Sequence, residues 1–256
     1  RLDKTPARNV RMGAKPGEGA PTPAQTFHLH RQARAQRARV LGMLLIGIKA
    51  DYSIALRRAP DARAACAEVW AAADAQDGGA ADSVVSLREL LGMTSAHEWR
   101  RVGVEVPALG EAPNNRIYPH YGVFSPVRGE YVRLVATAHL PKMPTGQTAL
   151  VAFDIGTGSG VLAAVLVRRG VGQVVATDND PRALACAQAN LTQLGVAAQV
   201  QLLKADLYPD GRASLIVCNP PWLPARPGSP IEHAVFDEGS QMLMGFLKGL
   251  AGHLAP

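Results

Sequence analysis

The sequence contains few of the features that mark secreted, metal-binding or membrane-spanning proteins. Its three cysteines, Cys66, Cys186 and Cys218, lie far apart and form no C-x-x-C pair. This spacing argues against a disulfide framework or a zinc site and favours a reducing compartment, so we expect a cytoplasmic protein. The longest apolar segment, residues 40–48, is about half as long as a membrane-spanning helix. No apolar segment follows the basic N-terminal residues at the distance typical of a secretory signal, so we expect no membrane partner.

Metal ligands are not recognisable either. Structural and catalytic zinc sites combine His and Cys at short, regular spacings. The seven histidines show no such spacing, and we therefore predict no metal site.

Positive charge is concentrated near the N-terminus. Residues 1–40 hold nine Lys or Arg and two acidic residues, whereas the remaining 216 residues hold 18 basic and 19 acidic side chains. Nucleic-acid binders usually carry a basic face on the folded domain itself. The near-neutral charge of the remaining residues therefore argues against a nucleic-acid-binding domain, although an Arg-rich tail could still hold RNA.

The chain of 256 residues, 47% of them hydrophobic, is long enough for a small and a larger domain. Residues 1–29 are rich in Pro, Gly, Ala and basic residues and are predicted to be a flexible basic tail. Residues 30–101 are predicted to be a helical domain for substrate recognition. Its helices are expected from about residue 30 through 52, over 61–77 and over 83–91. Ser86 and Glu89 have the spacing of a capping box, so the third helix could instead start after Ser86. Residues 102–143 are predicted to link the domains through short strands and a helix over 128–139.

From residue 144 onward, apolar strand-like runs alternate with helical patterns. Strands are predicted over 149–155, 173–178, 198–206 and 213–219, and helices over 161–169, 180–195 and 241–254. This alternation is typical of a doubly wound, Rossmann-like α/β sheet. Such domains normally continue with further strands, so we expect 144–256 to be part of a longer domain and the chain to be a fragment.

A glycine-rich turn follows the first of these strands, in "FDIGTGSG". Glycines let the backbone turn sharply, and the start of the next helix offers free N–H groups to a ligand. The dinucleotide fingerprint G-x-G-x-x-G has a third glycine where Val161 stands here, and no P-loop lysine follows. The Asp154 carboxylate would repel a pyrophosphate and suits a cation such as an amino acid's ammonium group.

This segment closely resembles motif I of class I S-adenosylmethionine-dependent methyltransferases. The resemblance implies that the turn cradles the methionine part of S-adenosylmethionine, that Asp178 holds the ribose hydroxyls and that Asp206 lies at the adenine amino group. Asp180, before Pro181, is interpreted as a helix N-cap. The cofactor-binding residues expected on this basis are Asp154, Gly156, Thr157, Gly158, Gly160, Asp178, Asn179, Asp206 and Leu207.

The fourth strand ends in "CNPPW". This stretch resembles the (N/D)-P-P-(Y/F/W) motif of methyltransferases that modify planar nitrogens, which include HemK-like protein glutamine methyltransferases and the adenine and guanine amino methyltransferases. The resemblance implies that Asn219 and Pro220 accept hydrogens from the acceptor nitrogen, that Pro221 stiffens the loop and that Trp222 stacks on the acceptor. These four are the expected catalytic residues.

The acceptor itself is left open between a protein glutamine and an RNA base. Trp222 stands where HemK-like enzymes usually carry Tyr, and "VFSPVRGEY" matches that family's upstream segment only loosely, through Phe124 and Pro126. We therefore expect an S-adenosylmethionine-dependent N-methyltransferase acting on a macromolecule. The alternatives are an NAD-dependent oxidoreductase on a similar sheet, or a cofactor-binding interaction module without catalysis.

Overall fold

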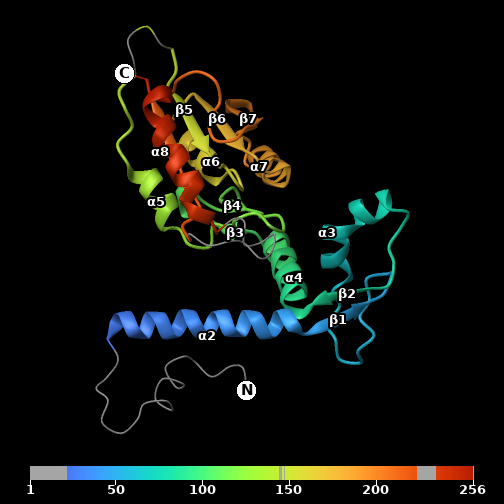
Figure 1. Ribbon diagram of the computed structural model, residues 1–256. Helices are drawn as coiled ribbons and strands as arrows, with labels where there is room; N and C mark the ends of the chain where they lie inside the picture. The colour runs from blue at the N-terminus through green and yellow to red at the C-terminus, as the bar shows by residue number, and fades with distance from the viewer. Residues whose placement is uncertain (1–21, 144–145, 147, 224–234, 256) are drawn as a thin grey trace. The chain divides into compact units, whose positions relative to one another are not determined.

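The computed structural model describes residues 22–143, 146, 148–223 and 235–255 (Figure 1). Most of the predicted basic tail, residues 1–21, lies outside this part of the chain. Two compact units are distinguished, Arg1–Leu91 and Gly92–Pro256. Within the described residues, no helix combines the length and apolar character needed to cross a bilayer.

The first unit consists of helices and one pair of antiparallel strands. Its elements are α2 (Pro23–Met43), β1 (Leu45–Ile48), α3 (Arg63–Gln76), β2 (Ser83–Ser86) and the start of α4 (Leu87–Val102). Helix α2 begins before the predicted residue 30, because Thr22 and Gln25 form a capping box and Pro23 occupies the first turn.

The strand pair corrects two helix predictions in this unit. Residues 45–48, expected to continue the first helix, instead form β1 and pair antiparallel with β2. A short apolar run fits either state, and here alternate residues Ile46, Ile48 and Val85 face inward. Since β2 ends at Ser86, α4 starts at Leu87, and the Ser86 hydroxyl accepts the Glu89 N–H at 3.1 Å, which confirms the competing start.

The second unit contains a four-stranded parallel sheet and confirms the predicted α/β fold. Its strands are β5 (Val151–Ile155), β6 (Gln173–Asp178), β7 (Val200–Lys204) and β8 (Leu215–Cys218), in the order β7-β6-β5-β8. Its main helices are α5 (Glu130–Thr137), α6 (Val161–Arg168), α7 (Pro181–Gln193) and α8 (Gln241–His253). The chain moves from β5 outward to β7 and then returns to β8 on the other side of β5. The carboxyl ends of β5 and β8 therefore form the switch point at which ligands bind in such sheets.

Both faces of the central strands β5 and β6 are buried, which is why these strands are mostly apolar. Even-numbered strand residues such as Ala152, Val174 and Ala176 pack in one core with α6, whose residues 161–166 are all buried. Odd-numbered residues such as Phe153 and Ile155 pack in a second core that includes Phe246 of α8.

The linking segment forms short strands, as predicted, and is fixed to the sheet domain by a buried asparagine. Strands β3 (Val104–Glu105) and β4 (Arg116–Ile117) pair antiparallel. Asn190 of α7 accepts the Tyr118 N–H at 2.8 Å and donates to the Ser159 carbonyl at 3.1 Å. The stretch after β4 is thereby held beside the glycine turn.

Candidate active site

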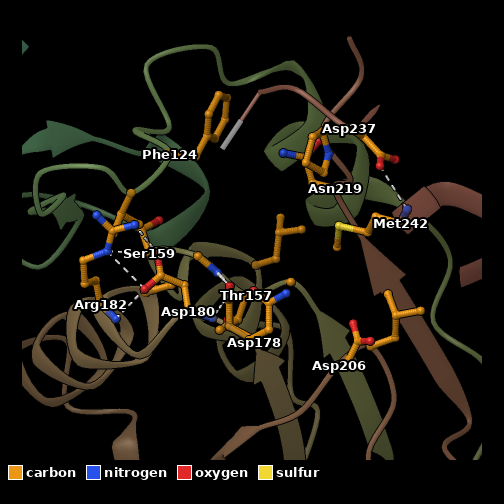
Figure 2. Close-up of a pocket in the computed structure, with 18 of the residues that line it drawn as sticks. Phe124, Thr157, Ser159, Asp178, Asp180, Arg182, Asp206, Asn219, Asp237 and Met242 are labelled. Carbon is orange, nitrogen blue, oxygen red and sulfur yellow. Dashed lines mark hydrogen bonds and ion pairs between the residues drawn. The ribbon is translucent and has the colours of Figure 1, made fainter. Parts of the chain in front are cut away.

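A cleft of about 920 Å³ lies at the carboxyl ends of β5, β6 and β8. Figure 2 shows Phe124, Asn219 and Asp237 on one side of it in this view and Thr157, Asp178 and Asp180 on the other. The glycine turn, the ends of β6 and β7, the loop after β8 and the start of α8 all contribute to its wall. Segments far apart in the sequence thus form one cavity at the switch point.

The glycine turn lines the cleft with its backbone. Gly156 has φ of 71° and Gly160 has φ of 80°, in the left-handed region that other residues rarely adopt. A Cβ on Gly156 would lie 2.6 Å from the Met242 methyl carbon, and one on Gly160 would lie 3.2 Å from the Ala187 backbone. The turn is closed by the Thr157 N–H, which donates to the Thr177 carbonyl at 2.8 Å. Gly156, Thr157 and Gly158 line the cavity, whereas Gly160 starts α6 behind it.

Asp154 lies beneath this turn. Its Oδ2 accepts the Thr157 hydroxyl at 2.8 Å and the Ala163 N–H at 3.1 Å, and its buried Oδ1 has no hydrogen-bond partner in the described structure. Burial raises the pKa of Asp154 to about 6; the hydrogen bonds from Thr157 and Ala163 oppose that rise. Asp154 does not itself line the cleft. The structure therefore makes it a support of the turn, and the expected contact with a ligand's cation stays a prediction.

Asp178 lines the cleft at the end of β6. Its two oxygens accept the Gly158 N–H at 2.9 Å and the Asp180 N–H at 3.0 Å, while burial raises its pKa. A carboxylate has about four acceptor positions, so it can still receive hydroxyl groups from a ligand. Asn179 is exposed beside it and also lines the cleft.

The start of α7 adds a cation that the sequence did not single out. Asp180 accepts the Arg182 N–H at 2.8 Å, which confirms its interpretation as an N-cap. The Arg182 guanidinium also forms an ion pair with Asp180 at 2.7 Å (Figure 2). It lies close to Gly122, where a Cβ would be 3.1 Å from an Arg182 nitrogen.

Asp206 and Leu207 line the cleft after β7. Leu207 has φ of 71°, a conformation that costs free energy for a residue other than glycine. It is fixed there because its carbonyl accepts the Thr177 hydroxyl at 2.5 Å and its side chain packs against Gly245, where a Cβ would come within 2.6 Å.

The Asn-Pro-Pro-Trp loop borders the cleft only in part. Asn219 and Pro221 line it, while Pro220 and Trp222 are not among the described residues that do. Trp222 is 52% exposed, and its ring lies edge-on to Phe124 with centroids 6.0 Å apart. Phe124 thus lines the cleft and Trp222 does not, and the expected stacking of Trp222 on an acceptor stays a prediction.

Several cleft residues were missed by sequence reasoning. Asp237 is buried, caps α8 by accepting the N–H groups of Met242 and Leu243, and faces the cavity (Figure 2). An Asp a few residues before a helix was the available signal. Tyr131 of α5 contributes from the linking segment, and no motif marked it. Among the described residues, no cluster of three or more His, Cys, Asp or Glu is placed to hold a metal ion.

The comparisons with known proteins agree with this geometry. Residues 114–245 match the family described as "Methyltransferase small domain". A ribosomal protein L11 methyltransferase of Pelotomaculum thermopropionicum is 48% identical over 69 residues, which are 26% of this chain and 22% of that protein. A release factor glutamine methyltransferase of Moorella thermoacetica is 38% identical over 117 residues, 40% of this chain and 41% of that protein.

A third relative is named as a tRNA methyltransferase. The tRNA1(Val) (adenine(37)-N6)-methyltransferase of a Shewanella species is 30% identical over 98 residues, 36% of this chain and 42% of that protein. The chain thus spans less than half the length of each of these curated relatives. None of them is an oxidoreductase, so the NAD-dependent alternative is not favoured. Since the family match covers just over half of the residues, the chain belongs to the methyltransferase small domain family.

Proposed function

We propose that the protein is an S-adenosylmethionine-dependent methyltransferase that acts on a planar amino or amide nitrogen of a macromolecule, with Asn219 and Pro220 as the groups that orient the nitrogen. The observation that carries the proposal is that Asn219 lines the same cavity as the glycine turn, at the switch point of the sheet. A methyl donor and an acceptor nitrogen must meet in one cavity for direct transfer, and this cavity has a face for each.

The cleft residues fit S-adenosylmethionine. The turn at 156–158 presents its backbone to the cleft, Asp178 retains acceptor capacity for two hydroxyl groups, and Asp206 and Leu207 also line the cleft and are assigned to the adenine ring. Asn179, exposed next to Asp178, is the further polar group on this side. Bound S-adenosylmethionine supplies a methyl group on a positively charged sulfur.

The chain's own contribution to catalysis is to prepare the acceptor. An amide or exocyclic amine is a poor nucleophile because its lone pair is delocalised. When the Asn219 side-chain oxygen and the Pro220 carbonyl accept its two hydrogens, the nitrogen can pyramidalise and direct its lone pair at the methyl carbon. The cofactor would supply the methyl group, and the Asn219 and Pro220 oxygens would hold the nitrogen in place while one N–H proton is lost to solvent. Pro221 restricts the loop so that both acceptors are fixed in advance.

The methyl acceptor in this proposal is either a protein side chain or an RNA base. The named relatives include enzymes for a ribosomal protein, a release factor and a tRNA. We place the reaction in the cytoplasm, because Cys66, Cys186 and Cys218 are all free thiols.

Labelled S-adenosylmethionine and a cell lysate test the proposal. The protein is incubated with methyl-labelled cofactor and lysate, with or without RNase or protease. Label lost on protease treatment identifies a protein acceptor, and label lost on RNase treatment identifies RNA. Binding of S-adenosylhomocysteine without any transfer would contradict the catalytic proposal and favour a non-catalytic interaction module.

A further inference from the structure

A second, smaller cavity of about 310 Å³ lies in the same unit as the cleft. One wall is a face of α4 with residues at helical spacing, including Gly92, Ala96 and Trp99. The other wall is the segment from Pro119 to Ser125, with Val235 at the edge. Trp99 is 42% exposed, so a large aromatic ring stands open at this surface.

The second cavity adjoins the cleft on the side of the acceptor. Gly122, Val123 and Phe124 line both cavities. Phe124 is also in edge contact with Trp222 of the Asn-Pro-Pro-Trp loop, and Asn219 of that loop lines the cleft. A group seated in the second cavity would therefore be a close neighbour of the nitrogen held at Asn219.

The residues that line the second cavity indicate which kind of group binds there. None of the described residues that line this cavity is Lys, Arg, Asp or Glu, and most are Gly, Ala, Val, Pro or aromatic residues. A nucleic-acid segment would bring phosphates without a countercharge and base edges with too few hydrogen-bond partners. An apolar amino-acid side chain needs neither, and its burial against aromatic and aliphatic walls is favourable.

We infer that the methyl acceptor is a polypeptide, and that this cavity binds an apolar side chain located next to the acceptor residue. This inference rests on the proposed function and narrows its acceptor to a protein. The cavity makes the enzyme specific for an apolar residue such as Leu, Met or Phe at one fixed position beside the methylated amide.

Peptide arrays test the inference. Nine-residue capped peptides carry a central Gln or Asn in a Gly/Ser/Ala host, and each flanking position is varied in turn among Leu, Met, Phe, Gly and Lys. Methyl transfer is measured with labelled cofactor, with a matched arm of RNA oligonucleotides. The expected result is at least about a tenfold preference in kcat/KM for apolar residues at one flanking position, with no transfer to the oligonucleotides.

Two variants connect that preference to the cavity. Ala96→Leu fills it and should remove the preference, whereas Trp99→Ala enlarges it and should move the preference toward Phe. Glu98→Leu is the matched control, since Glu98 lies on the same helix, is exposed and does not line the cavity; it should behave as the wild type. All three variants should bind S-adenosylhomocysteine within about twofold of the wild type.

Each outcome decides the matter. Three results would overturn the inference: equal rates for all residues at every flanking position, a preference that survives in both Ala96→Leu and Trp99→Ala, or transfer to the oligonucleotides alone. In each case the proposed function would stand, provided that the protein binds S-adenosylhomocysteine and transfers methyl groups. A wild-type protein that binds no S-adenosylhomocysteine would overturn both.

Discussion

The two sides of the cleft differ in how firmly the chain itself holds them. On the cofactor side, Asp154 is buried and bonded to the turn, and Asp178 holds the backbone of Gly158. On the acceptor side, no described residue forms a hydrogen bond with the Asn219 side chain, and Trp222 is half exposed. The cofactor side is preorganised by internal bonds, whereas the acceptor side presents groups that a substrate must satisfy. Substitutions on the two sides should therefore affect different steps.

The largest effect is expected for Asn219→Ala. Loss of the side-chain oxygen should lower kcat by about 10²- to 10³-fold, or roughly 2.7–4 kcal/mol, because an acceptor aimed at the reacting nitrogen is removed. Labelled transfer to the identified acceptor measures this loss. Calorimetry with S-adenosylhomocysteine should give an unchanged Kd, and equal losses in rate and binding would contradict the division of the cleft.

The second prediction concerns pH and Asp154. Since burial raises the pKa of Asp154 from 3.8 to about 6, the folded protein binds more protons than the unfolded chain between these values. The Asp154 contribution to stability is full below pH 4 and falls as pH rises to about 6, by at most about 3 kcal/mol. Denaturation of wild type and Asp154→Asn across pH 4–7 should show their stability difference changing in this window. A constant difference would mean that the carboxyl group titrates normally.

Asp178→Ala should weaken binding of S-adenosylhomocysteine by about 1–3 kcal/mol, because hydrogen bonds to a charged group are lost. Calorimetry measures the change in Kd. Asp178→Asn keeps one acceptor oxygen and should lose less. If both variants bind like the wild type, Asp178 only supports the Gly158 backbone and does not contact the cofactor.

Gly156→Ala should lower Tm, because a left-handed conformation usually costs about 1–2 kcal/mol for a residue with a Cβ. The free turn can relieve this cost by relaxing and must recover its conformation to bind, so the Kd for S-adenosylhomocysteine should also rise, by at most the same free energy. The Met242 methyl group can move aside, so the backbone term should dominate. Gly170→Ala is the matched control: Gly170 has φ of 91° with open space around it and does not line the cleft. The control should lower Tm without changing the Kd.

The smallest effect is expected for Trp222→Ala. Its ring is half exposed and contacts Phe124 by its edge, and such aromatic pairs contribute about 0.5–1.5 kcal/mol. The expected result is a fall in kcat/KM of roughly two- to tenfold at unchanged cofactor affinity. A loss as large as that of Asn219→Ala would show that Trp222 touches the acceptor directly.

The sheet and the two motifs could be predicted because each depends on local chemistry. A continuous apolar run marked the first strand, the alternation of strand-like and helical patterns marked the other three, and the glycine turn fell at the end of the first. The pairing of β1 with β2 could not be predicted in the same way, since residues 45–48 fit either a helix or a strand. Their pairing with residues 83–86, far along the chain, decided between the two.

The sequence alone determined which residues can adopt the special backbone of the turn and which strand ends carry Asp178 and Asn219, because glycine conformation and apolar patterning act over a few residues. Only the tertiary structure decided that Asp154 supports the turn from beneath, that Phe124 and Asp237 complete the wall, and that the Trp222 ring meets Phe124 edge-on. The cleft wall and the Phe124–Trp222 contact join segments separated by tens of residues, and their geometry follows from how α8 and the linking segment pack against the sheet rather than from any local pattern.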